Sequence, residues 1–117
     1  MNYFKDGEFK CAHCGRLIIS EVLRSKLNQA REIYGSPMPI VSGYRCEEYN
    51  AQVGGVQSSS HTKGEAADIA CMFGRDRLAM MKALLDVGFN RIGVGETFLH
   101  VDVSKDLPQD VMWVYGD

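Results

Sequence analysis

The 117-residue chain has no long apolar run, no excess of basic residues and only three histidines. None of its apolar stretches approaches the ~20 residues that a membrane-spanning helix needs. The net charge of −2 argues against a nucleic-acid-binding surface, which is usually basic. The start of the chain lacks the apolar core and cleavage site of a signal peptide, which predicts cytoplasmic synthesis without export. The length suits a single domain over residues 1–117.

Four cysteines are present, and the missing export signal predicts that they stay reduced. Cys11 and Cys14 form a CxxC motif that resembles half of a zinc ribbon, but no second CxxC completes it. Cys46 or Cys71 could contribute a further ligand only if the fold brings them close to this motif. A second metal at Cys11 and Cys14 is therefore left open.

Apolar periodicity and chain-breaking residues predict three helices. The first is expected from Ser20, a good N-cap residue, to Gly35. The second is expected from Arg45 to about Val53, and the third ends at Gly88. The apolar face of the first helix contains Leu23, Leu27, Ala30 and Tyr34, and that of the third contains Leu78, Met81 and Leu85.

Extended segments predict the remainder of the fold. They are expected at 40–41, 65–71, 91–94, 98–103 and 111–115. Helices followed mostly by strands predict a small α+β domain, with an antiparallel sheet flanked by helices. Residues 1–19 are expected to be an irregular segment docked on this domain.

Two of the three histidines lie in short segments that also contain aspartates. His61 comes seven residues before Asp68, and His100 comes thirty-two residues after it. Asp68 falls among small apolar residues of an expected strand, where a carboxylate is costly unless a metal or a partner compensates it. Gly64 allows a tight turn between His61 and that strand. Two imidazoles and one carboxylate suit one zinc ion and leave a coordination position for water.

Such a zinc ion would lower the pKa of its water to about 7 and polarise a carbonyl oxygen, the two effects that amide hydrolysis needs. A carboxylate must then move a proton from the water to the leaving amine. Asp102 shares the strand face of His100, whereas Glu96 lies at the entry to that strand. The spacing leaves both acids open, with a preference for Asp102. The other acid would orient His100 by accepting its hydrogen bond.

Four sequence blocks occur in a characteristic order. They are Ser42-Gly43-Tyr44-Arg45, Tyr49 to Gly55, Ser59-x-His61-x-x-Gly64-x-Ala66-x-Asp68, and Phe98-Leu99-His100-Val101-Asp102-Val103. With these blocks the chain resembles the zinc D-Ala-D-Ala carboxypeptidase family over residues 3–115. That family includes D,D-dipeptidases and the L-alanyl-D-glutamate endopeptidases of phage lysins, and it shares its metal site with the hedgehog domain.

The resemblance implies a hedgehog/DD-peptidase-like fold with His61, Asp68 and His100 as zinc ligands. It also implies that Arg45 binds or polarises the substrate and that Ser59 forms hydrogen bonds in the substrate groove. The substrate would be the stem peptide of peptidoglycan. The enzyme would be a monomer that reaches the cell wall after phage-mediated release.

One position departs from the better-known members, which carry the catalytic acid three residues before the last histidine ligand. That position is Thr97 here, and Glu96 is displaced from it by one residue. An alternative interpretation is therefore a zinc-binding module without turnover, which binds cell-wall peptide or serves in phage particle assembly. The residues do not distinguish a cut between two D-Ala residues from one between L-Ala and D-Glu.

Overall fold

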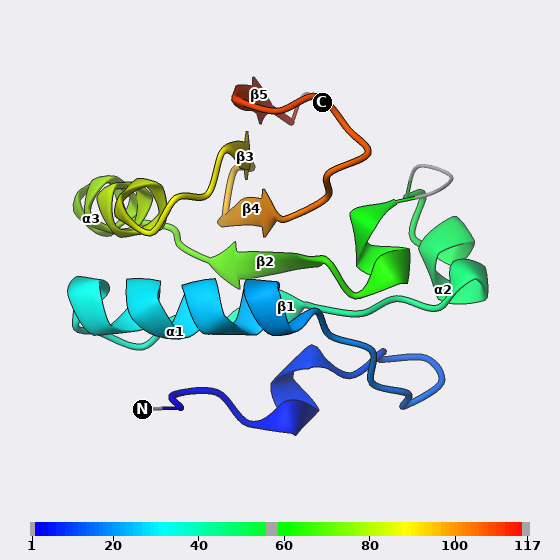
Figure 1. Ribbon diagram of the computed structural model, residues 1–117. Coiled ribbons are helices and arrows are strands. Elements are labelled where there is room, and N and C mark those ends of the chain that lie inside the picture. Colours follow the sequence, from blue (N-terminus) through cyan, green and yellow to red (C-terminus); the bar gives the residue numbers. More distant parts are fainter. Residues whose placement is uncertain (1, 56–58, 116–117) are drawn as a thin grey trace.

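Short helices and strands alternate along the described part of the chain, residues 2–55 and 59–115, in the computed structural model (Figure 1). The elements in order are η1 (Asp6–Phe9), α1 (Glu21–Tyr34), β1 (Ile40–Ser42), α2 (Glu47–Gln52), η2 (Ser60–Lys63), β2 (Ala66–Ala70), α3 (Gly74–Asp86), β3 (Arg91–Val94), β4 (Phe98–Asp102) and β5 (Val111–Val114). None of these helices is long and apolar enough to cross a membrane.

Helix α1 begins and ends where the sequence predicts. The Ser20 hydroxyl accepts a hydrogen bond from the Leu23 amide at 3.2 Å, which satisfies one of the free amides at the helix N-terminus. Gly35 ends the helix in the left-handed conformation at φ 77°, and its N–H donates to the Arg31 carbonyl. The predicted apolar face is confirmed, with Leu23, Leu27 and Ala30 buried.

The five strands form one sheet in the order β1-β2-β4-β3-β5. Neighbouring strands are antiparallel except for β5, which runs parallel to β3. The α+β class is confirmed, and the expected antiparallel sheet contains one parallel pair, that of β3 and β5. Strand β4 ends beside the start of β3, because the two strands are antiparallel. Residues 103–110 then pass to the other side of β3, and β5 begins beside the start of β3 and runs parallel to it.

The two faces of the sheet carry different residues because side chains alternate along a strand. On one face, Ala67 and Ile69 of β2 and Leu99 and Val101 of β4 join the hydrophobic core that α1 and α3 cover (Figure 1). The alternate residues of the same strands point to the opposite face. The polar residues discussed below lie on that second face.

Helix α3 buries a different face from the predicted one. Met80, Ala83 and Leu84 pack into the core, whereas Leu78 and Leu85 are 60% and 50% exposed. Residues 78–85 are apolar nearly all round the helix, so two helical faces fit the same pattern. Packing against α1 and the sheet decides which of these faces is buried, and it buries the one that carries Met80, Ala83 and Leu84.

The described part of the N-terminal segment packs on the helices and strands and includes the single turn η1. Phe4 and Phe9 are buried in the core. The Tyr44 amide donates to the Phe9 carbonyl at 2.9 Å. A side chain at Gly43 would start only 2.7 Å from the Phe9 backbone, so this close contact requires glycine. The segment therefore supports the chain that leads from β1 into α2.

Candidate metal centre

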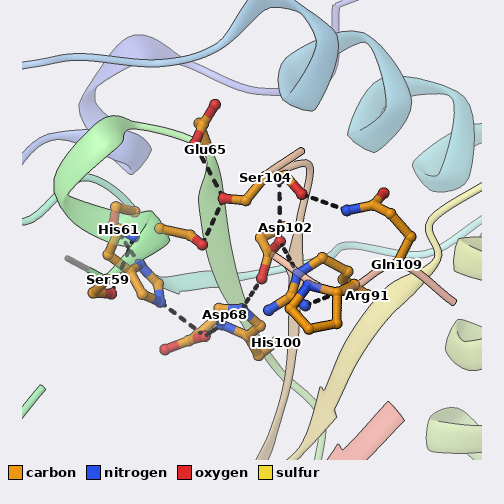
Figure 2. Close-up of polar contacts among 12 residues, drawn as sticks. Ser59, His61, Glu65, Asp68, Arg91, His100, Asp102, Ser104 and Gln109 are labelled. Atoms are coloured by element: carbon orange, nitrogen blue, oxygen red, sulfur yellow. Dashed lines mark hydrogen bonds and ion pairs between the residues drawn. The ribbon is translucent and has the colours of Figure 1, made fainter. Parts of the chain in front are cut away.

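The three predicted ligands meet on the second face of the sheet (Figure 2). Asp68 of β2 and His100 of β4 are direct partners in the strand register, which places their side chains next to each other. His61 approaches from η2. Gly64 follows that turn at φ 70°, and a Cβ atom there would lie 2.3 Å from the Ile18 carbonyl oxygen. The tight turn that brings His61 over the strand therefore depends on glycine.

The His61 ring is fixed in one tautomer. Its Nδ1 lies 2.7 Å from the Gly43 carbonyl oxygen, and a carbonyl can only accept, so Nδ1 carries the proton. The buried Nε2 has no hydrogen-bond partner among the residues that the structure describes. It faces Asp68 Oδ1 at 3.3 Å. In the neutral ring two lone pairs face each other, and a cation bound between them would remove this repulsion.

His100 lies between two carboxylates. Its Nδ1 is 2.8 Å from Asp68 Oδ1, and its Nε2 is 2.8 Å from Asp102 Oδ2. Burial lowers the pKa of His100, but hydrogen bonds and attraction to Asp102 and Asp68 outweigh this effect and raise it. Burial raises the pKa of Asp68, yet the hydrogen bond from His100 and the attraction to the two histidines hold it well below its usual value. The pocket therefore favours a carboxylate and positive charge next to it.

Asp102 is held on the side of His100 that faces away from Asp68. It is only 1% exposed, and its Oδ1 accepts from Arg91 Nε at 2.7 Å and from the Ser104 amide at 3.2 Å. Burial raises its pKa, but His100 and Arg91 lower it below the usual value. An ionised Asp102 holds a proton on Nε2 of His100 and leaves Nδ1 on the side of Asp68, the usual arrangement behind a histidine that binds a metal.

A cavity of about 540 Å³ opens over these residues. Arg45 lines it, with its guanidinium held by Ser42 Oγ at 3.0 Å from Nε and by Asn50 Oδ1 at 3.3 Å from Nη1. Nη2 lies 3.4 Å from Asp68 Oδ2. Ser59 also lines the cavity, and its hydroxyl accepts from the His61 amide at 3.2 Å. Both predicted substrate residues therefore reach the same space as the three ligands.

Sequence reasoning missed the wall of this cavity. Trp113 and Tyr115, which we call the aromatic wall, come from β5 and the residue after it. The two rings lie 5.5 Å and 6.3 Å from the His100 ring. Gly93 of β3 makes room for them, because a Cβ atom there would be 2.6 Å from both side chains. The alternation of 111, 113 and 115 on one strand face was the signal available in the sequence.

Glu96 takes no part in the site as it stands. It is exposed on the turn between β3 and β4, and it is not one of the described residues that line the cavity. Its backbone carbonyl accepts from Arg77 Nη1 at 3.2 Å. The neighbouring Thr97 uses its carbonyl to accept from the Cys71 amide at 2.9 Å. The roles of Asp102 and Glu96 in proton transfer therefore stay predictions.

The donor set fits zinc. One potential ligand atom from each of His61, Asp68 and His100 lies within 4.8 Å of the other two. Nitrogen and oxygen ligands about 2.0 Å from a tetrahedral zinc ion stand about 3.3 Å apart, close to the separations of 2.8 Å and 3.3 Å found here. The lone pair on Nε2 of His61 has no hydrogen-bond partner among the described residues, and a bound cation would provide a partner for it.

The comparison with protein families agrees with this geometry. The family model for Peptidase M15 matches residues 3–104 and so includes all three predicted ligands. The chain belongs to the Peptidase M15 family. Peptidases of this family depend on zinc, and their substrates contain peptide bonds. The match ends before β5, so the aromatic wall lies outside it. A comparison with curated proteins gives no significant match.

Proposed function

We propose that this protein is a zinc-dependent peptidase that hydrolyses a peptide bond in the stem peptide of peptidoglycan. The observation that carries the proposal is the buried Nε2 of His61, which faces Asp68 and His100 without a hydrogen-bond partner among the described residues. Membership of the Peptidase M15 family supports the class of reaction. The four sequence blocks that resemble D-Ala-D-Ala carboxypeptidases support the choice of substrate.

His61 Nε2, an Asp68 oxygen and His100 Nδ1 would hold the metal. Three protein ligands leave a position open, and zinc bound in this way polarises a carbonyl oxygen and lowers the pKa of water to about 7. Two residues fix the imidazoles in the required tautomers. The Gly43 carbonyl accepts a hydrogen bond from Nδ1 of His61, and the Asp102 carboxylate accepts one from Nε2 of His100.

Arg45 would bind the substrate. Stem peptides carry free carboxylates, and a guanidinium binds a carboxylate through two parallel hydrogen bonds. Ser42 and Asn50 hold the Arg45 side chain in one orientation, so little conformational entropy is lost when a peptide binds. The same group can instead polarise the scissile carbonyl. Ser59 would contribute a hydroxyl to the groove next to it.

Tyr115 adds a further polar contact to the cavity. Burial and the charges of Asp68 and Asp102 raise its pKa, so its phenol keeps its proton at neutral pH and can donate to a peptide carbonyl. Trp113 supplies the neighbouring apolar surface, which suits the methyl groups of alanine residues. The aromatic wall would therefore position the peptide over the ligands.

The proton-transfer step needs a carboxylate that is free to accept a proton. Both oxygens of Asp102 already accept hydrogen bonds from His100, Arg91 and Ser104, which favours a positioning role for Asp102. We therefore assign the transfer to Glu96. Because this acid lies outside the cavity lining, its role requires the β3–β4 turn to move toward the bound peptide.

The finer assignments extend the same proposal. The bond cut would be that of a D-Ala-D-Ala carboxypeptidase or of an L-Ala-D-Glu endopeptidase. The protein would act as a monomer at the cell wall, after phage-mediated release. The rival function is a zinc module that binds wall peptide, or takes part in phage particle assembly, without turnover. Thr97 favours this rival, because a hydroxyl at the family's acid position cannot serve as a carboxylate base.

The test is digestion of purified peptidoglycan by the zinc-loaded protein, with mass spectrometry of the released fragments. We expect new termini that disappear when a chelator is added, and the mass of each fragment names the bond. Asp68→Asn should abolish both zinc binding at the His61-Asp68-His100 site and fragment release. Its matched control is Asp106→Asn, which changes an exposed carboxylate that pairs with Lys63 at 3.6 Å. Peptide binding without release from several wall types would support the rival function instead.

A further inference from the structure

A second group of metal-binding side chains lies away from the sheet. The sulfur atoms of Cys11, Cys14 and Cys46 lie within 4.8 Å of one another, although Cys46 is 32 residues away in sequence from Cys14. Cys11 is buried, Cys46 is half-buried and Cys14 is exposed. The fold therefore provides the third thiol that the CxxC motif lacks in the sequence.

The turn that contains the first two cysteines is built to present both sulfurs on one side. The Gly15 amide donates to the Cys11 carbonyl at 2.9 Å, and the Cys11 amide donates to the Arg16 carbonyl at the same distance. Gly15 adopts the left-handed conformation at φ 73°. A glycine in this conformation directly after a CxxC pair closes the loop without steric cost, so the two side chains converge.

Backbone amides point at two of the sulfurs. The Cys46 amide lies 3.4 Å from Cys11 Sγ, and the Tyr49 amide lies 3.4 Å from Cys46 Sγ. Cys46 is the N-cap residue of α2, so its sulfur sits where the free amides of a helix N-terminus gather. Amides that donate to a ligand sulfur stabilise the thiolate form and fix its direction, as surrounding groups do around bound metals.

His13 supplies a fourth donor. Its Nδ1 lies 3.5 Å from Cys46 Sγ. The imidazole ring is stacked on Tyr49, with an interplanar angle of 4° and 6.1 Å between ring centres. This stacking orients the ring, and its Nδ1 lies next to the sulfur of Cys46 although the residue itself is exposed.

We propose that Cys11, His13, Cys14 and Cys46 bind a second zinc ion in a closed structural site. Three thiolates and one imidazole form a known ligand set for structural zinc, with the C-x₂-C spacing that such sites use. With Zn–S distances of about 2.3 Å, tetrahedral geometry places the sulfurs about 3.8 Å apart, so the three sulfurs, now within 4.8 Å of one another, need to contract by about 1 Å or less. All four tetrahedral positions are filled by protein, which leaves no place for a reacting water.

This second zinc would tie the N-terminal segment to the chain that supports the first site. Cys46 directly follows Arg45, whose amide donates to the His61 carbonyl at 3.0 Å. Gly43, three residues before Cys46, accepts from His61 Nδ1. The structural zinc would therefore hold both the substrate arginine and the backbone acceptor of one zinc ligand. Metal binding by the cysteines does not require the protein to hydrolyse peptides.

Cobalt substitution separates the two sites. Thiolate ligands give Co²⁺ an intense charge-transfer band in the near ultraviolet, and the His61-Asp68-His100 set contains no sulfur. We expect the reduced wild-type protein to bind two metal ions per chain by elemental analysis and to show this band. Cys14→Ser and Cys46→Ser should each lose the band and one equivalent of metal. Asp68→Asn should keep the band while losing the other equivalent.

Two further variants sharpen the test. Cys71→Ala removes a thiol outside the cluster and should retain both metal ions and the full band. His13→Ala should weaken metal binding at the cysteine site by tenfold or more, and unchanged affinity would remove His13 from the ligand set. Cys14 is exposed, so its substitution by serine leaves the core intact, and circular dichroism checks folding. A reduced wild-type protein without the band, or a disulfide among these cysteines in the protein isolated without reductant, would overturn the proposal.

Discussion

Replacing Asp102 by asparagine distinguishes a positioning residue from a general base. The substitution keeps the size of the side chain and removes its charge. The carboxylate accepts from Arg91, His100 and Ser104 and is 1% exposed. The oxygen of the asparagine amide can still accept a hydrogen bond, but its NH₂ group replaces the other oxygen and faces a hydrogen-bond donor. His100 then loses the partner that holds its proton on Nε2, and Arg91 remains as a poorly compensated buried cation.

The expected loss of folding free energy is about 3 kcal/mol, since a hydrogen bond to a charged group contributes about 1.5–3 kcal/mol and more than one is weakened. For a chain of this length, each kcal/mol shifts the melting temperature by about 4 °C, which predicts a decrease of about 12 °C. The pKa of Asp102 is lowered in the folded protein, so its stabilising effect is present above the usual aspartate pKa and is lost as the pH falls through the lowered value. The difference between wild type and D102N should therefore be fully developed at neutral pH.

Zinc affinity and turnover decide the role of Asp102. Loss of the group that orients a ligand histidine weakens metal binding by about 10- to 100-fold. We expect this loss in a titration against a competing chelator, with kcat recovering to within about tenfold of wild type at saturating zinc. Loss of a general base instead lowers the rate by about 10²- to 10⁴-fold whatever the zinc concentration. A fall of that size with unchanged zinc affinity would refute the positioning role, and Asp106→Asn serves as the exposed control.

Three further substitutions test the rest of the site. Glu96→Gln should lower kcat by at least about 100-fold at unchanged zinc content, and an unaltered rate would exclude this acid as the base. Gly93→Val should raise KM more than tenfold in peptide hydrolysis and lower stability by about 1–3 kcal/mol, because the new side chain displaces the aromatic wall; a normal KM would separate that wall from substrate binding. Arg45→Lys should lower kcat/KM by about 10- to 100-fold through loss of the guanidinium fork, while the exposed control Arg75→Lys should not; equal rates for both would leave Arg45 without a substrate role.

The convergence of His61, Asp68 and His100 could be predicted because each depends on local rules. Alternation along a strand sets the face of Asp68 and of His100, and a glycine turn brings the preceding histidine back over the strand. The small number of histidines also helped the prediction, since two of only three lie in these segments. The caps of α1 at Ser20 and Gly35 followed for the same reason, because each acts within a few residues.

What could not be predicted depends on long-range packing. Periodicity indicates that 111–115 is a strand but does not say that it lies beside β3 or in which direction it runs. The aromatic wall follows from that pairing and was missed for the same reason. The prediction of the buried face of α3 was wrong because more than one face of this helix is apolar. The third thiol of the cysteine cluster meets the first two through long-range packing, in which the chain around Gly43 lies against Phe9 and the Cys46 amide contacts Cys11 Sγ.

The strand order has a consequence for hydrogen exchange. Strands β2 and β4, which carry Asp68 and His100, lie inside the sheet, whereas β5 forms an edge and pairs within the described sheet with β3. Amides in the interior of a sheet open to solvent at a far higher free energy than amides at its edge. Deuterium should therefore enter β5 well before it enters β2 and β4. Asp68 and His100, two of the three proposed metal ligands, thus lie on slowly exchanging backbone beside an edge strand that can open locally. Under the proposed function, a peptide would enter and leave past the aromatic wall while the geometry of these two residues is preserved.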